Sequence, residues 1–439
     1  MKFNFIKKSL VKDTAIYTVT DMLGKAMSFV LIPIVSFYLS PDELGLATNF
    51  TVMTSILILL AGVAIVNSIP YFFYEQDKDE NNALVSNLLI LAFFVCTFFC
   101  FVILVFSSVI NECLKFDIYV QYLAVVYVIC SLISQTNLLL YRLEDKPKIF
   151  ALFQIVQIVL HALFVILFVI VVRGGGVGKI YAEVMVFLFM GIIHAVMLRR
   201  RGYLVIHINT LWMKKLIIFG LPLLPHSISF WFKSGTDKIL ITTFCGLFYN
   251  GLYSMALSVA SIYTMLVNSF FNAYTPYLQK RLAQMTPETE TREKKSIVKQ
   301  TYFLFFLFFV VSVLTICGSW IIFEYMLNQK YLPAFQYLPL IIIAYFIYSF
   351  YSFVVNYIYK VKKTLVMGII TFTGSLVQMV LSYFMIEDFG VMGAVYSLLI
   401  GNVLITLGIF IYSNMVYPMP WFFRPPKTVT GSFNGYFRL

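Results

Sequence analysis

The stretch TDMLGKAMSFVLIPIVSFYLSPDELG, residues 20–45, is an apolar run that contains two opposite charges, Asp21 and Lys25. About 20 apolar residues suffice to cross a bilayer as a helix. A charged side chain at the centre of a bilayer costs at least about 2.5 kcal/mol, so lipid would expel these two residues. They lie four residues apart and can pair on one helix face. The stretch therefore predicts a membrane helix whose polar face turns towards the protein interior.

The composition of the whole chain also indicates a membrane protein. Of the 439 residues, 61% are hydrophobic and 12% are charged, whereas a soluble protein carries roughly a quarter of charged residues. The net charge is +12, but the basic residues lie between apolar runs, which indicates membrane topology and not binding to nucleic acid. The six cysteines form no CxxC pair and the four histidines are dispersed. We therefore expect no metal site and no cofactor.

Twelve apolar runs are long enough to cross the membrane as helices, which satisfy their own backbone in lipid. If the N-terminus is inside, the inside segments hold 25 of the 32 lysines and arginines, and the outside loops hold four. This asymmetry indicates twelve spans with both termini cytoplasmic. The runs fall near residues 14–39, 46–73, 84–110, 118–141, 149–172, 180–198, 216–243, 251–275, 300–323, 335–359, 364–386 and 391–417.

Three short motifs recur in the same order in the two halves of the chain. LSPDELGL (39–46) pairs with CGLFYNGL (245–252), YRLEDK (141–146) with YKVKKT (359–364), and GGVGKIY (175–181) with GVMGAVY (390–396). Because six spans is an even number, both copies start on the same side and form parallel repeats. We predict an all-α integral membrane protein with a central cleft between two six-helix halves. The predicted parts are the halves 1–198 and 216–417, the basic linker 199–215 and the cytoplasmic tail 418–439.

Polar residues at helical spacing lie on one face of several predicted spans. Such residues often form hydrogen bonds between helices in a bilayer, but several polar faces in one chain favour a hydrated interior. The candidates for that interior are Asn268 and Asn272 on the eighth span and Tyr348, Ser352 and Asn356 on the tenth.

Six ionised side chains lie inside the predicted spans, where they need a partner, a ligand or a route to the surface. The seventh span also contains GLPLLPHS (220–227), whose two prolines free backbone carbonyls inside the membrane. His226 lies beside this break and is either a hydrogen-bonded core histidine or a titrating one. The six charges are Asp21, Lys25, Glu183, Lys233, Asp237 and Lys238.

Two segments resemble a known family. GKAMSFVLIPIVSFYLSPDELGLA (24–47) resembles the first helix and loop of bacterial O-antigen (Wzx-type) and exopolysaccharide flippases. These proteins belong to the MATE-like multidrug/oligosaccharidyl-lipid/polysaccharide (MOP) exporter superfamily. FGLPLLPHSISFWFKSGTDKILIT (219–242) is similar to a second signature, a Gly-Leu-Pro break followed by Asp and a basic residue. Here that pair is Asp237-Lys238, where the family more often has Arg. The resemblance extends over the whole chain in length and helix count.

The resemblance implies a flippase that moves an undecaprenyl-diphosphate-linked oligosaccharide from the inner to the outer leaflet of the bacterial cytoplasmic membrane. We expect transport by alternating access and no enzymatic activity. The resemblance also implies H⁺ or Na⁺ as a coupling ion and polysaccharide polymerase machinery as a partner. Lys25, Lys233 and Lys238 would bind the diphosphate, and Asn268, Asn272, Tyr348, Ser352 and Asn356 the sugars. Asp21, Glu183, Asp237 and His226 would couple transport to the ion.

Three alternatives stay open from the sequence. A lipid II flippase of the same superfamily generally has extra C-terminal helices, whereas this chain has twelve predicted spans. A multidrug or cation antiporter needs carboxylates for its cargo, whereas the predicted spans hold three lysines and three acids. A glycan polymerase or ligase usually has a large outer loop with catalytic arginines, and none of the predicted outer loops is long.

Overall fold

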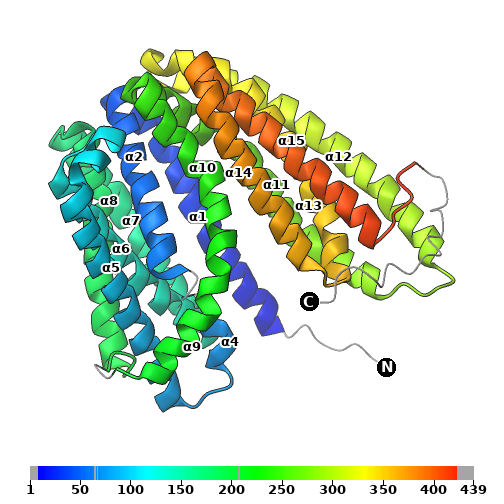
Figure 1. Cartoon of the computed structure of the whole chain (residues 1–439), viewed down its shortest axis with the longest axis horizontal. Helices are drawn as coiled ribbons and strands as arrows, with labels where there is room; N and C mark the ends of the chain where they lie inside the picture. Colours follow the sequence, from blue (N-terminus) through cyan, green and yellow to red (C-terminus); the bar gives the residue numbers. More distant parts are fainter. Residues whose placement is uncertain (1–7, 64–65, 67, 206–207, 423–439) are drawn as a thin grey trace.

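The computed structural model describes residues 8–63, 66, 68–205 and 208–422, and the regular structure of these residues is helical. Two helix bundles lie side by side; they converge at one end and diverge at the other (Figure 1). Eleven helices of the described part are long and apolar enough to cross a membrane. The remaining predicted span is a broken helix, α9–α10. The chain is therefore a multi-pass membrane protein with the predicted twelve-helix architecture.

The amino-terminal half contains six long helices. A 40–43 capping box starts α2: the Ser40 side chain accepts from the Glu43 backbone N–H, and Glu43 Oε2 accepts from the Ser40 N–H at 2.7 Å. A short helix, α4 (Ile69–Phe73), precedes α5, and single π-helical turns extend α2 (Leu59–Val63) and α7 (Ile166–Val171). The long helices are α1 (Lys8–Tyr38), α2 (Pro41–Ile58), α5 (Lys78–Leu114), α6 (Ile118–Leu143), α7 (Pro147–Val165) and α8 (Gly175–Arg200).

The carboxyl-terminal half repeats this arrangement. Its first span is broken into α9 (Thr210–Gly220), a 3₁₀ turn (Leu221–Leu223) and α10 (Leu224–Cys245). The predicted break at 220–227 is thus confirmed. A π-helical turn (Ile322–Met326) and a 3₁₀ helix (Gln329–Tyr337) connect the middle helices. The other helices are α11 (Leu247–Ala283), α12 (Glu290–Ile321), α13 (Leu338–Lys360), α14 (Thr364–Phe389) and α15 (Val391–Val416).

Several helices extend beyond their apolar runs. The acidic segment before α5 was predicted as a loop to residue 83, yet the helix begins at Lys78. Asp77 caps it by accepting from the Glu80 N–H at 2.9 Å, and Asp79 and Glu80 in the first turn complement the helix dipole. An apolar run shows which part of a helix lies in the lipid, whereas the capping residues determine the residue at which the helix begins.

The broken helix contacts both halves. On α9, Trp212 is buried and donates to Glu80 Oε2 at 2.6 Å, next to α5 of the amino-terminal half. On α10, Asp237 accepts from Ser382 of α14 at 2.6 Å. The predicted linker 199–215 is therefore helical from Thr210 onwards, and this helix packs on the amino-terminal half.

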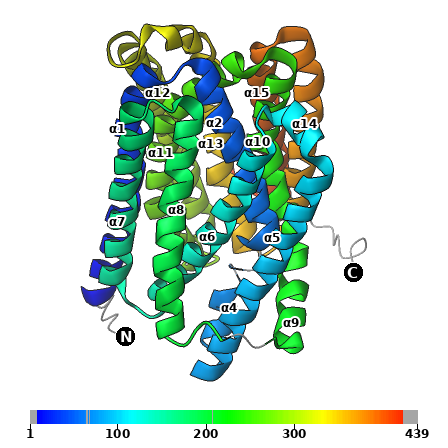
Figure 2. The same cartoon turned by 90° about the vertical axis from the view of Figure 1, so that its left-hand side faces the viewer.

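The loops separate into two groups at opposite ends of the molecule (Figures 1 and 2). We call one end the basic end; it contains the segments 74–77, 144–146, 201–205, 208–209, 284–289 and 361–363, which belong to segments predicted to be inside. Tyr74, for example, donates to the Leu143 carbonyl there at 3.2 Å. At the opposite end, Tyr331 donates to the Leu39 carbonyl at 3.1 Å. The loops thus alternate as the charge pattern predicts.

One repeated motif has the same backbone role in both halves. Gly175 and Gly390 have φ of +58° and +57°, a region that favours glycine, at the turns that precede α8 and α15. Three residues later, Gly178 and Gly393 lie so close to the preceding helix that a Cβ atom would clash with the carbonyls of Phe168 and Met385. The shared sequence G-x-x-G thus encodes one turn, used twice.

Candidate functional site

A cavity of about 480 Å³ lies between the two halves. Helices α1, α7 and α8 form one wall and α11 forms the other, and much of the remaining lining is apolar, including Phe29, Val35 and Leu44. The volume falls in the range of about 300–1,000 Å³ that is typical of small-molecule sites. The polar lining residues are Lys25, His161, Lys179 and Glu183 on the amino-terminal wall and Ser258, Ser261, Thr264 and Asn268 on α11.

The amino-terminal wall carries the charges. Lys179 Nζ lies 3.9 Å from Glu183 Oε1, one turn further along α8. Lys25, on α1, forms no ion pair with any residue that the structure describes. With two lysines and one carboxylate, this wall has a net positive charge even when His161 is neutral. Such a wall attracts an anion.

The α11 wall carries hydroxyl groups in a row. Ser258, Ser261 and Thr264 donate to backbone carbonyls of their own helix, at 2.8, 2.6 and 2.9 Å respectively. A hydroxyl has one hydrogen and two lone pairs. Because each hydrogen is already used, these side chains offer the cavity acceptor oxygens. Asn268 continues the row and is exposed.

The two halves touch at the end opposite the basic end. Gly45 of α2 packs on the Leu247 carbonyl, and Gly251 of α11 packs on the Pro41 carbonyl, each so closely that a Cβ atom would clash. In the repeat, Pro41 corresponds to Leu247 and Gly45 to Gly251, so the contact is reciprocal. We call these two contacts the glycine crossing.

A buried polar cluster lies next to the glycine crossing. Asn49 Oδ1 accepts from Asn250 Nδ2 at 2.8 Å and from Thr242 Oγ1 at 3.1 Å. Asn49 Nδ2 donates to the Leu114 carbonyl at 2.9 Å. The three side chains are at most 1% exposed. Hydrogen bonds thus join α2 to α10 and α11 where the halves meet.

The structure separates the two charges of the opening stretch. Lys25 lines the cavity, whereas Asp21 lies 3.3 Å from Arg142 at the end of α6, with both side chains nearly half exposed. Within the described residues, Asp21 therefore pairs with Arg142 and not, as its spacing suggested, with Lys25. Arg142 also lies over the Phe150 ring at 4.3 Å, which holds it beside Asp21.

Two further predicted phosphate ligands lie on α10. Lys233 Nζ lies 3.3 Å from the centre of the Tyr348 ring, and Tyr348 stacks on Tyr351 at 5.0 Å. This places two predicted residues together, within the carboxyl-terminal half and outside the lining of the cavity. Lys238 is partly buried and directly follows Asp237 in α10.

Asp237 lies in a hydroxyl pocket of the carboxyl-terminal half. It is 3% exposed and accepts from Ser382 at 2.6 Å and from Tyr253 at 3.4 Å. Ser382 in turn lies 2.7 Å from Ser397 of α15. The structure thus places this carboxylate away from the lining of the cavity, in a site where a bound proton or cation would meet oxygen ligands.

The remaining predicted residues are not part of the cavity lining. Asn356 is buried and accepts from Gln279 of α11 at 3.2 Å, a contact between helices. Ser352 accepts from Asn356 through its backbone carbonyl, and Asn272 is exposed one turn beyond Asn268. His226 lies on α10, but its side chain is outside the described residues.

Lys179 and His161 were not among the predicted site residues. Lys179 was counted with the outer loops because the apolar run begins at residue 180, but α8 begins at Gly175 and carries Lys179 into the cavity. The spacing of Lys179 and Glu183, four residues apart, could have indicated a shared helix face. His161 follows Gln154 and Gln157 at helical spacing in the fifth predicted span, and this polar face could have indicated it.

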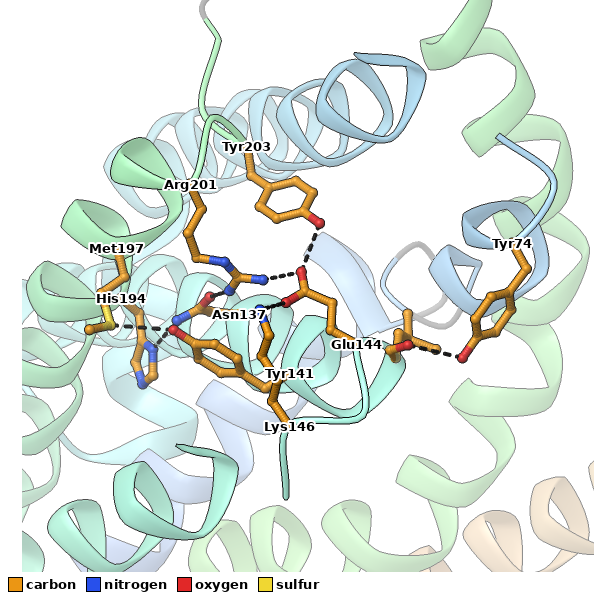
Figure 3. Close-up of polar contacts among 10 residues, drawn as sticks. Tyr74, Asn137, Tyr141, Glu144, Lys146, His194, Met197, Arg201 and Tyr203 are labelled. Atoms are coloured by element: carbon orange, nitrogen blue, oxygen red, sulfur yellow. Dashed lines mark hydrogen bonds and ion pairs between the residues drawn. The ribbon is translucent and has the colours of Figure 1, made fainter. Parts of the chain in front are cut away.

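A second polar network lies at the basic end (Figure 3). Arg201 donates to Glu144 and, at 2.7 Å, to Asn137, while Tyr203 and Lys146 donate to Glu144 at 2.8 and 2.7 Å. Burial raises the pKa of Glu144, but these hydrogen bonds and the Arg201 charge outweigh it, so the pKa lies below its ordinary value. Burial, and then the hydrogen bond to Glu144, raises the pKa of Tyr203 to about 12. The network ties the 144–146 and 201–203 turns together.

The arrangement of helices is that of the MATE-like transporters. An inward-facing multidrug resistance MATE family transporter of the MOP superfamily is 14% identical, with a TM-score of 0.70 over 92% of this chain and 97% of that one. The lipid II flippase MurJ, in an inward closed conformation, is 10% identical and also scores 0.70, over 92% and 87%. An outward-facing MATE transporter of the MOP superfamily, 16% identical over 92% and 95%, scores 0.58. The fold is therefore MATE-like.

Residues 10–282 match the family described as polysaccharide biosynthesis protein, and the chain belongs to that family. A protein of the Lsg locus of Haemophilus influenzae is 22% identical over 361 residues, which is 80% of this chain and 85% of the relative. An uncharacterized membrane protein of the same organism is 19% identical over 363 residues, or 81% and 85%.

Proposed function

We propose that the protein is a flippase that moves an undecaprenyl-diphosphate-linked oligosaccharide from the inner to the outer leaflet of the bacterial cytoplasmic membrane. The observation that carries this proposal is the cavity between the halves, with two lysines on one wall and a row of hydroxyls on the other. A diphosphate needs cations and a glycan needs polar partners, while the polyprenyl chain can stay in lipid. Membership of a polysaccharide biosynthesis family supports the same cargo.

The mechanism we propose is alternating access without chemical change of the cargo. The halves touch at the glycine crossing and diverge at the basic end. With the basic end in the cytoplasm, as proposed below, this is the arrangement of an inward-open transporter. Movement of one half against the other would close the basic end and open the opposite one. Asp237 and Glu183, the two carboxylates in or beside polar sites of the spans, are candidates to bind H⁺ or Na⁺ during this cycle.

The test is to remove the gene from its host and to identify the lipid-linked glycan that accumulates. We expect an undecaprenyl-diphosphate oligosaccharide on the inner leaflet and loss of the corresponding surface polysaccharide. Accumulation of a peptidoglycan precursor would instead support a lipid II flippase, as MurJ, one of the structural relatives, is. Unchanged glycolipids together with sensitivity to cationic drugs would support an antiporter. Because the cavity contains more lysines than carboxylates, it favours an anionic, diphosphate-linked glycan over a cationic drug.

We also propose that the basic end is cytoplasmic, because lysine and arginine are retained on that side. Single cysteines can be placed in the 286–296 and 387–390 segments of a protein whose six cysteines have been replaced. An impermeant thiol reagent applied to intact cells should label the second segment and not the first. Labelling of 286–296 from outside would reverse the proposed orientation.

A further inference from the structure

We propose that the cavity holds its substrate in one orientation, with the diphosphate on the amino-terminal wall and the sugar hydroxyls on α11. This inference rests on the proposed function, since it assumes a diphosphate-linked glycan. Its basis is that the two walls differ in charge and in polar groups. The amino-terminal wall carries the ammonium groups of Lys25 and Lys179 beside Glu183 and His161, whereas α11 carries a row of hydroxyl oxygens that continues to the amide of Asn268.

The donor wall is formed by Lys25 and Lys179. An ammonium group has three hydrogens and no lone pair, so it can only donate. Lys179 and Glu183 are 3.9 Å apart, which is too long for a hydrogen bond, so the ion pair leaves the ammonium hydrogens of Lys179 available. Phosphate oxygens accept strong hydrogen bonds from cations. The two ammonium groups of this wall therefore fit a diphosphate.

The acceptor wall is formed by Ser258, Ser261 and Thr264. Each hydroxyl gives its hydrogen to a carbonyl of α11, at 2.6 to 2.9 Å, and so presents lone pairs to the cavity. Sugar hydroxyls can donate to these lone pairs, whereas a diphosphate has only acceptor atoms to offer. Met255 and Met265 lie on the same wall and provide an adaptable apolar surface for sugar rings.

The division of the site has a consequence for selectivity. The donor wall belongs to the amino-terminal half and the acceptor wall to the carboxyl-terminal half, so a complete substrate contacts both halves at once. A polyprenyl diphosphate without sugar contacts only the donor wall. The protein can thus distinguish loaded from unloaded carrier lipid by whether the ligand bridges its two halves.

The experiment measures binding of two probes to the purified full-length protein in lipid nanodiscs. One probe is farnesyl diphosphate, which has no sugar, and the other is the lipid-linked oligosaccharide recovered from cells that lack the gene. The variants are Lys179→Gln on the donor wall and Ser258→Ala or Ser261→Ala on the acceptor wall. The matched control is Ser269→Ala, because Ser269 also donates to a carbonyl of α11 at 2.7 Å but is exposed and outside the cavity lining.

We expect Lys179→Gln to weaken binding of both probes about ten- to a hundredfold, the effect of one charge-assisted contact. Ser258→Ala and Ser261→Ala should each weaken the oligosaccharide lipid about three- to tenfold and leave farnesyl diphosphate unchanged. Ser269→Ala should alter neither, and thermal melting verifies that each variant is folded.

Two different failures can be told apart. If the serine variants weaken farnesyl diphosphate as much as the oligosaccharide lipid, or weaken neither, the assignment of the two walls is wrong. If the unmodified protein binds neither probe, or if no oligosaccharide lipid accumulates in the deletion strain, the proposed function itself is overturned.

Discussion

Lys25 projects from α1 into the cavity without an ion pair in the described part of the chain. Charges within membrane spans commonly face a water-filled cavity and mark a substrate or ion pathway, which makes Lys25 a candidate contact for the ligand. We expect Lys25→Gln to fold normally and to weaken substrate binding about ten- to a hundredfold, whereas Lys25→Arg should keep partial function. The measurement is the rate at which a fluorescently labelled lipid-linked oligosaccharide is flipped in vesicles that contain the purified protein. Lys148→Gln is the control, because Lys148 is an exposed lysine on α7.

A double substitution separates ligand binding from charge balance. Because Asp21 pairs with Arg142, Asp21→Ala combined with Lys25→Ala should remain as defective in transport as Lys25→Ala alone. Full transport by the double variant would show that Lys25 serves only to neutralise Asp21.

We expect the contribution of Glu144 to the free energy of unfolding to depend on pH. Its pKa lies below the ordinary value in the folded protein, so the folded state favours the carboxylate. The stabilisation is complete above the unfolded pKa of about 4.3 and is lost as the pH falls through the lower folded pKa. Glu144→Gln should reduce the free energy of unfolding by about 1.5–3 kcal/mol at pH 7 and weaken its dependence on acid. Melting in detergent from pH 7 to pH 3 tests this, with exposed Glu112→Gln as the control; equal pH dependence in both variants would contradict it.

At the level of single residues, the sequence indicated part of the cavity and missed part of it. Lys25, Glu183 and Asn268 could be found because charged and polar residues inside apolar runs need an explanation. Lys179 lies at the edge of its run and was counted as a loop lysine, although its four-residue spacing from Glu183 could have indicated a shared helix face. Asp21 and Arg142 are 121 residues apart, and their contact depends on how α1 packs on α7 next to the end of α6, which spacing along one helix cannot show.

The pairing of helices α2 and α11 depends on two positions without side chains. Gly45→Ala and Gly251→Ala would each place a Cβ against a backbone carbonyl of the other half, which cannot move aside as a side chain can. Alanine favours a helix by about 1 kcal/mol over glycine, so any defect must arise from the contact. We expect both variants to shift the protein towards opening at this end.

The measurement is labelling of a cysteine at Met265, which lines the cavity, by an impermeant reagent from outside the cell. The rate should rise in both glycine variants on a background without other cysteines. Gly318→Ala is the control, because a Cβ at Gly318 meets no atom within 4 Å. Equal labelling rates in all variants would mean that the crossing does not keep this end closed.

The apolar centres of the helices were predicted more accurately than their ends. The break at 220–227 was visible because two prolines within four residues interrupt a helix. The packing of α9 on α5 was not visible, since it depends on the contact of Trp212 with Glu80, 132 residues away. The polar ends of α5 and α12 were read as loops because hydropathy does not detect helices that continue beyond the lipid.

Alternating access predicts that fixing the halves together stops transport. At the closed end Phe37 of α1 is exposed and Lys330 of the other half is partly buried, and Lys330 Nζ donates to the Phe37 carbonyl at 3.3 Å. A short, cleavable thiol reagent that links Phe37→Cys to Lys330→Cys should hold the inward-open arrangement and abolish flipping. Cleavage of the linker should restore flipping. Full transport while the link is intact would rule out movement at this end.

The architecture of the whole molecule was accessible from the sequence because three independent patterns agree. The apolar runs indicated the membrane spans. The basic residues indicated that successive loops lie at alternate ends of the molecule, and the repeated motifs indicated two halves. The shape of the cavity was not accessible, because it depends on the angle between the halves. That angle is set by contacts such as Asn49 to Asn250, 201 residues apart, and no pattern within one helix contains it.

The glycine crossing also bears on how such a molecule can arise and vary. A reciprocal contact needs one small residue per repeat, and in a symmetric pair of identical six-helix chains a single glycine would serve both sides. Since each side rests on backbone atoms, the side chains around it are free to differ between the copies. Duplicated halves can therefore diverge in the side chains around this contact and still keep the contact itself.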